Sequence, residues 1–110
     1  MMELDYLPID RNRIKFRPDR FATSIDGKQL IFRVSWNPVA ERFFTDIFDI
    51  EGVTIVEGRA ITYGTDITEN VMDERLPDAM IVPADPAGEF TEITFDNFMR
   101  EVKPWIVGGS

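Results

Sequence analysis

Short runs of β-branched and aromatic residues, separated by turn-forming residues, recur along the whole chain. The turn signals follow one another at intervals of about 8–12 residues, and no stretch of about 15 residues has the apolar spacing of an α-helix. This pattern is typical of β-sandwiches and small β-barrels. We therefore predict an all-β fold, a small antiparallel β-barrel or β-sandwich of about six to eight short strands.

The clearest local signal is a β-hairpin whose turn is formed by Asp26 and Gly27. Every second residue from Leu30 to Trp36 is a large apolar one, as in a strand with one buried face. An Asp-Gly pair favours a tight hairpin turn because glycine adopts positive φ values without steric cost. The preceding run, 14–25, is interrupted by a proline, so we predict two short strands or one broken edge strand there.

Further strands are predicted over residues 42–50, 53–63, 79–82, 90–95 and 101–107. Phenylalanine lies on both faces of the first of these runs, so the pattern does not assign its buried face. Gly58 predicts a β-bulge or a sharp bend in the second run. Pro104 suits an edge strand, because proline cannot donate to a sheet ladder. Residues 65–78 are predicted to form a loop with at most one helical turn.

The chain length of 110 residues fits a single hydrophobic core. We predict one all-β domain over residues 1–107, followed by a flexible tail at 108–110. Structural turns are expected at Asp26, Gly27, Gly52, Gly58, Gly64 and Asp66. No run approaches the roughly 18 consecutive apolar residues of a membrane helix, and the acidic start of the sequence has no signal-peptide core. We therefore expect synthesis in a cytoplasm and no membrane partner.

Cysteine and histidine are absent from the sequence. The chain therefore has no thiolate nucleophile, no imidazole base and none of the usual ligands for zinc or an iron–sulfur cluster. The remaining candidates are carboxylates on neighbouring predicted strands and turns: Asp46, Asp49, Glu51 and Glu57. A paired-carboxylate glycosidase needs a walled cleft, and a calcium loop of the EF-hand type needs a different spacing and a central glycine. We predict no catalytic residues, no cofactor and no metal site.

Charge is divided unevenly along the chain. Residues 1–42 carry eight basic and six acidic side chains, a net charge of +2, whereas residues 43–110 carry four basic and fourteen acidic ones, a net charge of −10. Together these give the overall charge of −8. An anionic chain repels phosphate backbones at long range, so we expect no specific nucleic-acid partner.

Five of the eight basic residues of the first part gather in one segment, and they are candidates for contact with an acidic partner protein: Arg11, Arg13, Lys15, Arg17 and Arg20. The alternative is that these side chains are solvated and alternate along an edge strand. The two tryptophans, Trp36 and Trp105, suggest a second function, a carbohydrate-binding module that stacks sugars on exposed aromatic rings. Aromatic residues at alternate strand positions are, however, more typical of a buried core.

The order of these segments resembles that of the small baseplate plug proteins of contractile-tailed bacteriophages. The similarity extends from about Tyr6 to Val107 and begins with the segment 6–9, which precedes the basic run. The middle of the pattern is matched by Gly58, Ile61, Gly64, Asp66 and Ile67. The later strand of the family corresponds to residues 80–83 and its closing strand to residues 102–107, although Pro104 departs from the expected run.

The resemblance implies a non-enzymatic structural protein of a phage or prophage tail baseplate. It further implies a position near the central hub, where the protein helps to close the tail lumen. Its partners would be other baseplate, hub or tape-measure proteins, in an oligomeric state that the sequence leaves open. Such a protein is expected to be made in the host cytoplasm and then built into the virion.

Overall fold

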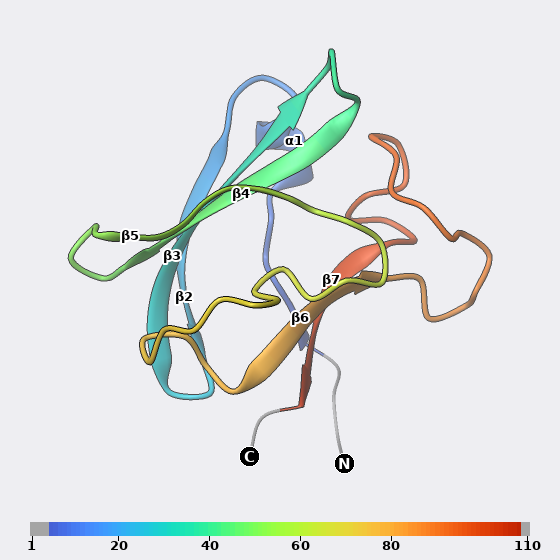
Figure 1. The fold of residues 1–110 in the computed structure, drawn as a ribbon. Coiled ribbons are helices and arrows are strands. Elements are labelled where there is room, and N and C mark those ends of the chain that lie inside the picture. Colours follow the sequence, from blue (N-terminus) through green and yellow to red (C-terminus); the bar gives the residue numbers. More distant parts are fainter. Residues whose placement is uncertain (1–4, 109–110) are drawn as a thin grey trace.

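The computed structural model describes residues 5–108, which form seven β-strands and one short helix (Figure 1). The elements follow the order β1 (Asp5–Tyr6), α1 (Arg11–Ile14), β2 (Asp19–Ile25), β3 (Lys28–Asn37), β4 (Arg42–Asp49), β5 (Thr54–Ala60), β6 (Ala79–Ala84) and β7 (Lys103–Gly108). The segment 61–78 between β5 and β6 contains no strand or helix, as predicted for residues 65–78.

The strands form two antiparallel sheets. The three-stranded sheet has the order β1-β7-β6, and the four-stranded sheet has the order β2-β3-β4-β5. Side chains from both sheets meet in one hydrophobic core, which includes Leu7, Phe32 and Ile81. The sheets do not join into a closed barrel. The all-β prediction is therefore confirmed, and of its two alternatives the β-sandwich describes the fold.

The β2–β3 hairpin forms as predicted. Ile25 pairs with Lys28, which leaves Asp26 and Gly27 as a two-residue loop. Their φ values of 49° and 79° are both positive, as a type I′ hairpin turn requires. Along β3 the side chains of Leu30, Phe32 and Val34 are buried in the core. The alternation in the sequence therefore marks the inner face of this strand.

The register of β4 against β3 decides which of its two phenylalanine-bearing faces is buried. Ile47 pairs with Phe32 of β3, so its side chain shares the inner face with that residue. Phe43 lies on the same face and is 1% exposed, whereas Phe44 is half-buried on the outer face. The long-range pairing, rather than the pattern of β4 itself, assigns the two faces.

β5 contains the β-bulge that Gly58 predicts. Between two regular pairs of β4 and β5, Glu57 and Gly58 together lie opposite the single residue Asp46. Gly58 has a φ of 64°, and its N–H donates a 2.7 Å hydrogen bond to Oδ1 of Asp46. The bulge is thus held by a side chain of the neighbouring strand. The sequence predicts that this strand continues to residue 63, but it ends at Ala60.

Residues 14–18, predicted as strand, are not extended. Helix α1 leads into a turn, and β2 begins only after the proline at position 18. Oδ1 of Asp10 accepts hydrogen bonds from the backbone N–H groups of Asn12 and Arg13, at 2.9 and 3.2 Å. Such a cap satisfies N–H groups that the first turn of a helix leaves unpaired, so it favours helix over strand at this position.

Residues 90–95, predicted as a strand from their alternation, form an irregular loop. The carboxylate of Asp85 accepts a hydrogen bond from the N–H of Phe90 at 3.0 Å, and Oδ1 of Asn97 accepts one from Thr94 at 2.9 Å. Side chains therefore bind backbone donors that a sheet ladder would have used. The prediction is wrong because it considered only the side-chain alternation.

β7 is the central strand of its sheet, so the edge position predicted from Pro104 is wrong. Pro104 lies opposite Pro83 of β6, and neither residue has an N–H to donate. On the other side, the N–H of Leu7 donates to the Pro104 carbonyl at 3.1 Å, while the Leu7 carbonyl accepts from Ile9 at 2.9 Å. Pro104 is tolerated at the centre because neither neighbour requires an N–H from it.

An aromatic cluster joins the four-stranded sheet to the loop before β7. The ring centroid of Phe43 lies 4.4 Å from that of Phe98 and 4.7 Å from that of Trp36. Trp36 in turn lies 5.1 Å from Phe95. These contacts place a loop without strands directly over the inner face of the sheet, so that the loop forms part of the core.

The predicted tail, 108–110, begins at Gly108, which is the last residue of β7. The other two residues of this tail lie outside the described residues. Among residues 5–108 no helix is long and apolar enough to cross a membrane.

The burial of β4 can be tested with two adjacent phenylalanines. We expect Phe43→Ala to lower the free energy of unfolding by about 3–5 kcal/mol, because it removes a ring from the middle of the core. Phe44→Ala, on the outer face, is the matched control and should lose well under half of that amount. Urea unfolding followed by circular dichroism measures both values. Equal losses for the two variants would contradict the assigned register.

Candidate functional site

Arg11, the first of the predicted partner-contact residues, is bound within the molecule. Its Nη1 donates hydrogen bonds to the carbonyl oxygens of Phe95 and Phe98, both at 2.8 Å. Its guanidinium carbon also lies 5.5 Å from the centroid of the Phe95 ring. Arg11 therefore anchors the loop before β7 to α1, and it is not free to bind a partner.

Arg13 is bound only in part. Its Nε lies 3.4 Å from Oδ1 of Asp19, and its side chain remains 46% exposed. Asp19 is buried at the start of β2, and its Oδ2 accepts a 2.7 Å hydrogen bond from the N–H of Asp10. Asp10 and Asp19 thus fix the position of α1 on the sheet.

The turn after α1 projects into solvent. We call residues Lys15, Phe16 and Arg17 the α1 tip. The N–H groups of Phe16 and Arg17 both donate to the Arg13 carbonyl, at 3.0 and 3.2 Å, which closes the turn. Phe16 is 86% exposed, and both of its cationic neighbours are exposed as well. Within residues 5–108, Lys15 and Arg17 form no ion pair.

The structure thus divides the five predicted contact residues. Arg13, Lys15 and Arg17 lie close together around Phe16, and three of these four side chains line a shallow hollow of about 380 Å³ together with Asp10 and Asn12. Arg11 is directed toward the core loops, and Arg20 stands on the sheet, with its guanidinium carbon 5.9 Å from the centroid of the Phe48 ring. Arg13 and Arg20 are exposed as well, but each contacts another side chain of the protein, whereas Lys15 and Arg17 of the α1 tip form no ion pair within residues 5–108.

The segment 63–67, which contains the predicted turn residues Gly64 and Asp66, covers the outer edge of β6. The N–H of Gly64 donates to the Pro83 carbonyl at 2.8 Å, and the N–H of Ile67 donates to the Ile81 carbonyl at 2.9 Å. Oδ1 of Asp66 accepts the N–H of Ile81 at 2.9 Å. Because these bonds occupy the edge, β6 offers no open ladder to another strand.

A salt-bridge cluster ties the loop before β6 to the β4–β5 turn. Nη1 of Arg75 lies 2.8 Å from Oδ2 of Asp49, and Nη2 lies 2.6 Å from Oδ2 of Asp73. The hydrogen bond from Arg75 lowers the pKa of Asp73 to about 2. For Asp49, the backbone N–H of Val53 is the largest cause of a lowered pKa; partial burial opposes it, and Arg75 adds to it.

Beside this cluster the surface is hollowed and acidic. A groove of about 570 Å³, which we call the acidic groove, lies next to the β2–β3 turn and is lined by Lys28, Thr68, Val71, Met72, Asp73, Glu74, Leu76, Pro77 and Asp78. A second hollow of about 620 Å³ adjoins it and shares Lys28 and Glu74. Met72 is 97% exposed. The acidic groove is therefore lined by apolar side chains together with three carboxylates and one cation, Lys28.

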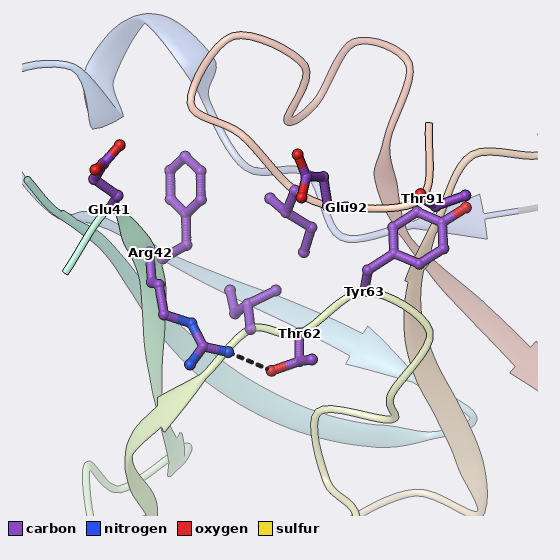
Figure 2. Close-up of a pocket in the computed structure, with 9 residues that line it drawn as sticks. Glu41, Arg42, Thr62, Tyr63, Thr91 and Glu92 are labelled. Atoms are coloured by element: carbon purple, nitrogen blue, oxygen red, sulfur yellow. Dashed lines mark hydrogen bonds between the residues drawn. The ribbon is translucent and has the colours of Figure 1, made fainter. Parts of the chain in front are cut away.

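Another pocket, of about 310 Å³, lies between β4, the segment after β5 and the loop 91–93 (Figure 2). Arg42 is turned toward Thr62 and donates a 2.8 Å hydrogen bond to its Oγ1. Glu41 and Glu92 stand apart at this pocket, and the hydroxyl of Tyr63 accepts the N–H of Asp85 at 3.0 Å. The polar groups of this pocket are thus either bound to other groups of the protein or distant from one another. We therefore assign no reaction to the pocket.

Of the four carboxylates considered for catalysis or calcium binding, Glu51 and Glu57 are exposed, and the two aspartates have structural partners. Asp46 accepts the N–H of Gly58 and lies 3.2 Å from Nη1 of Arg33. Oδ1 of Asp49 accepts the N–H groups of Glu51 and Val53, as a turn-forming aspartate does. In the part of the chain that the structure describes, no three acidic side chains are placed to share a metal ion.

The two tryptophans differ in their surroundings. Trp36 packs into the aromatic cluster of the core and is no stacking platform. Trp105 lies on the outer face of the three-stranded sheet, where its ring meets Tyr6 edge-on at 5.3 Å and its Nε1–H donates to the Ala84 carbonyl at 3.0 Å. The ammonium of Lys103 lies 4.6 Å from the Tyr6 ring and 5.8 Å from the Trp105 ring. These rings are already engaged by a cation of the same chain.

Comparison with known protein families supplies a match over nearly the whole chain. Residues 4–108 match the model of a family described as "Cyanophage baseplate Pam3 plug gp18". The matched range includes every strand from β1 to β7. No curated protein sequence matches the chain.

The cover over β6 can be tested at Asp66. We expect Asp66→Ala to lower the free energy of unfolding by about 1–3 kcal/mol, because the N–H of Ile81 loses its acceptor. Asp66→Asn keeps a side-chain oxygen and should lose less. Urea unfolding compares the two variants with the unmodified protein. If the alanine and asparagine variants were equally stable, the hydrogen bond to β6 would not matter.

The Arg75 cluster predicts a specific acid sensitivity. Because the pKa of Asp73 is lowered from 3.8 to about 2, the cluster stabilises the fold above pH 3.8, and this stabilisation is lost as the pH falls toward 2. We expect Arg75→Met to have a lower melting temperature at pH 7, and the difference to shrink below pH 4. Thermal melts at low ionic strength measure this, with Arg100→Met as the control. A difference that stayed constant down to pH 2 would contradict the prediction.

Proposed function

Because the chain belongs to the cyanophage baseplate plug family, we propose that it helps to close the central hub of a phage or prophage tail. The observation that carries this proposal is the family match over residues 4–108. Membership of the family makes the protein a tail baseplate component with a structural role. Beyond this structural role, we propose that the protein closes the hub and that contacts with other proteins hold it in place.

We also propose that the protein acts without catalysis. The sequence contains neither cysteine nor histidine. Of the carboxylates that remain as candidates, Asp46 and Asp49 are bound by backbone N–H groups and arginines of the same chain, and the two glutamates are exposed. Groups held in this way support the fold, and they are not placed around a shared substrate cleft.

The binding partners proposed for the plug are other baseplate, hub or tape-measure proteins. Among the predicted contact residues, Lys15 and Arg17 of the α1 tip support this best, because they are exposed and unpaired within residues 5–108. Their charge suits an acidic surface on the neighbouring protein. Phe16 between them supplies apolar area to the same contact.

The cellular history of the protein follows from this role. We propose that residues 1–107 fold as one domain in the host cytoplasm and that the folded protein is then incorporated into the virion. No specific nucleic-acid partner is proposed, because the net charge of −8 repels a phosphate backbone. No membrane partner is proposed either.

Incorporation into particles tests the proposal. We expect the variant Lys15→Glu/Arg17→Glu to be incorporated roughly tenfold less than the unmodified protein, because it sets like charges against the acidic partner. Arg42→Glu/Arg100→Glu changes the net charge equally at exposed places outside the α1 tip and the acidic groove, and is the matched control. Both variants are produced in cells carrying the phage with its own copy of the gene deleted. Immunoblots of purified tails give the incorporated amounts, and circular dichroism checks folding.

Equal incorporation of the α1-tip variant and the control would rule out this contact. Absence of the unmodified protein from purified tails would contradict the baseplate role as a whole.

A further inference from the structure

The α1 tip and the acidic groove lie at opposite ends of β2. The tip precedes the first residue of the strand, and the groove lies beside the turn that follows its last residue, at Lys28. Figure 1 shows α1 and the β2–β3 turn at opposite ends of the molecule. The seven residues of β2 place them roughly 20 Å apart. One molecule therefore cannot bring its own tip to its own groove.

Each of the two surfaces exposes an apolar group that its fold leaves uncovered. Phe16 is 86% exposed at the tip, and Met72 is 97% exposed at the acidic groove. In the floor of the groove Leu76 is 8% exposed, with Val71 and Pro77 half-buried beside it. Burial of a phenylalanine ring in such a groove is favourable, because apolar surface of both the ring and the groove is removed from water.

The net charges around these apolar groups are opposite in sign. Lys15 and Arg17 flank Phe16 at the tip. The groove is lined by the exposed Glu74 and Asp78 and by Asp73, which outnumber its single cation, Lys28. A tip facing a tip would oppose like charges, and so would a groove facing a groove. Pairing of identical surfaces is therefore disfavoured, and pairing of tip with groove is favoured.

We propose that the α1 tip of one molecule binds the acidic groove of a second copy of this chain. The inference rests on the proposed function, in that it names the partner of the α1 tip. Because the two surfaces differ and lie at opposite ends, the contact is head to tail. It leaves one free tip and one free groove in every dimer, so that further copies add until a ring closes.

Sedimentation velocity of the purified full chain tests this contact. We expect the sedimentation coefficient to rise with protein concentration in about 0.01 M NaCl and much less in about 1 M NaCl, where charges are screened beyond about 3 Å. Lys15→Glu/Arg17→Glu and Glu74→Lys/Asp78→Lys should each raise the dissociation constant about tenfold or more. Asp73 is left unchanged in these variants because it belongs to the Arg75 cluster.

The decisive measurement is a mixture of the two charge-reversed variants. Each one retains the surface that its counterpart needs, so an equimolar mixture should associate although neither variant does so alone. Phe16→Ser, which keeps every charge, should weaken association of the otherwise unmodified chain. Circular dichroism and melting temperature check that each variant is folded.

An unmodified chain that stays monomeric at low salt would overturn the inference, and so would a mixture that fails to associate. If the chain were monomeric while Lys15→Glu/Arg17→Glu still reduced incorporation into tails, the tip would bind another baseplate protein. The proposed function would then stand without this inference. If copies associated as expected but the same variant entered tails normally, the self-contact would stand and the proposed role of the tip in the baseplate would fail.

Discussion

Hydrogen bonds from backbone N–H groups to aspartate side chains hold together the parts of this molecule that its short strands do not reach. Aspartates cap α1, pin the bulge in β5, close the β4–β5 turn, cover β6 and shape the loop after it; they are Asp10, Asp46, Asp49, Asp66 and Asp85. A small two-sheet protein has many turns and edges relative to its core, and each buried donor there needs an acceptor. The short aspartate side chain reaches nearby backbone where a longer one does not.

This arrangement separates the acidic residues into two groups. Within residues 5–108 no glutamate carboxylate accepts a hydrogen bond from the backbone, and all of these glutamates are exposed. Part of the overall charge of −8 is therefore carried by aspartates that are already bound within the protein, and fewer carboxylates are available to a partner than this number suggests. The surface that a partner meets is set by the glutamates and by the few unbound aspartates, such as Asp78. Their positions, more than the total, decide which face attracts a cationic neighbour.

The elements predicted correctly from the sequence are those whose cause is local. The Asp26–Gly27 turn and the bulge at Gly58 depend on backbone conformations that neighbouring residues already indicate. The strand predicted at 90–95 failed because side-chain acceptors bind its donors. Helix α1 was not predicted; it depends on the Asp10 side chain, which accepts N–H groups of its first turn. The central position of Pro104 depends on partners 21 and 97 residues away in sequence, which no local pattern records. The same limit applies to the acidic groove, which joins a hairpin turn to a distant loop.

The cover that segment 63–67 places over β6 also bears on how the protein behaves before it reaches a particle. An uncovered edge strand recruits other strands, and the resulting assemblies are slow to dissolve because the main chain itself forms the bond. With this edge occupied by bonds such as that from Gly64 to Pro83, crowded copies of the chain cannot add strands to one another through β6. Contacts made there must use side chains, and such contacts can be corrected when two molecules meet in the wrong orientation.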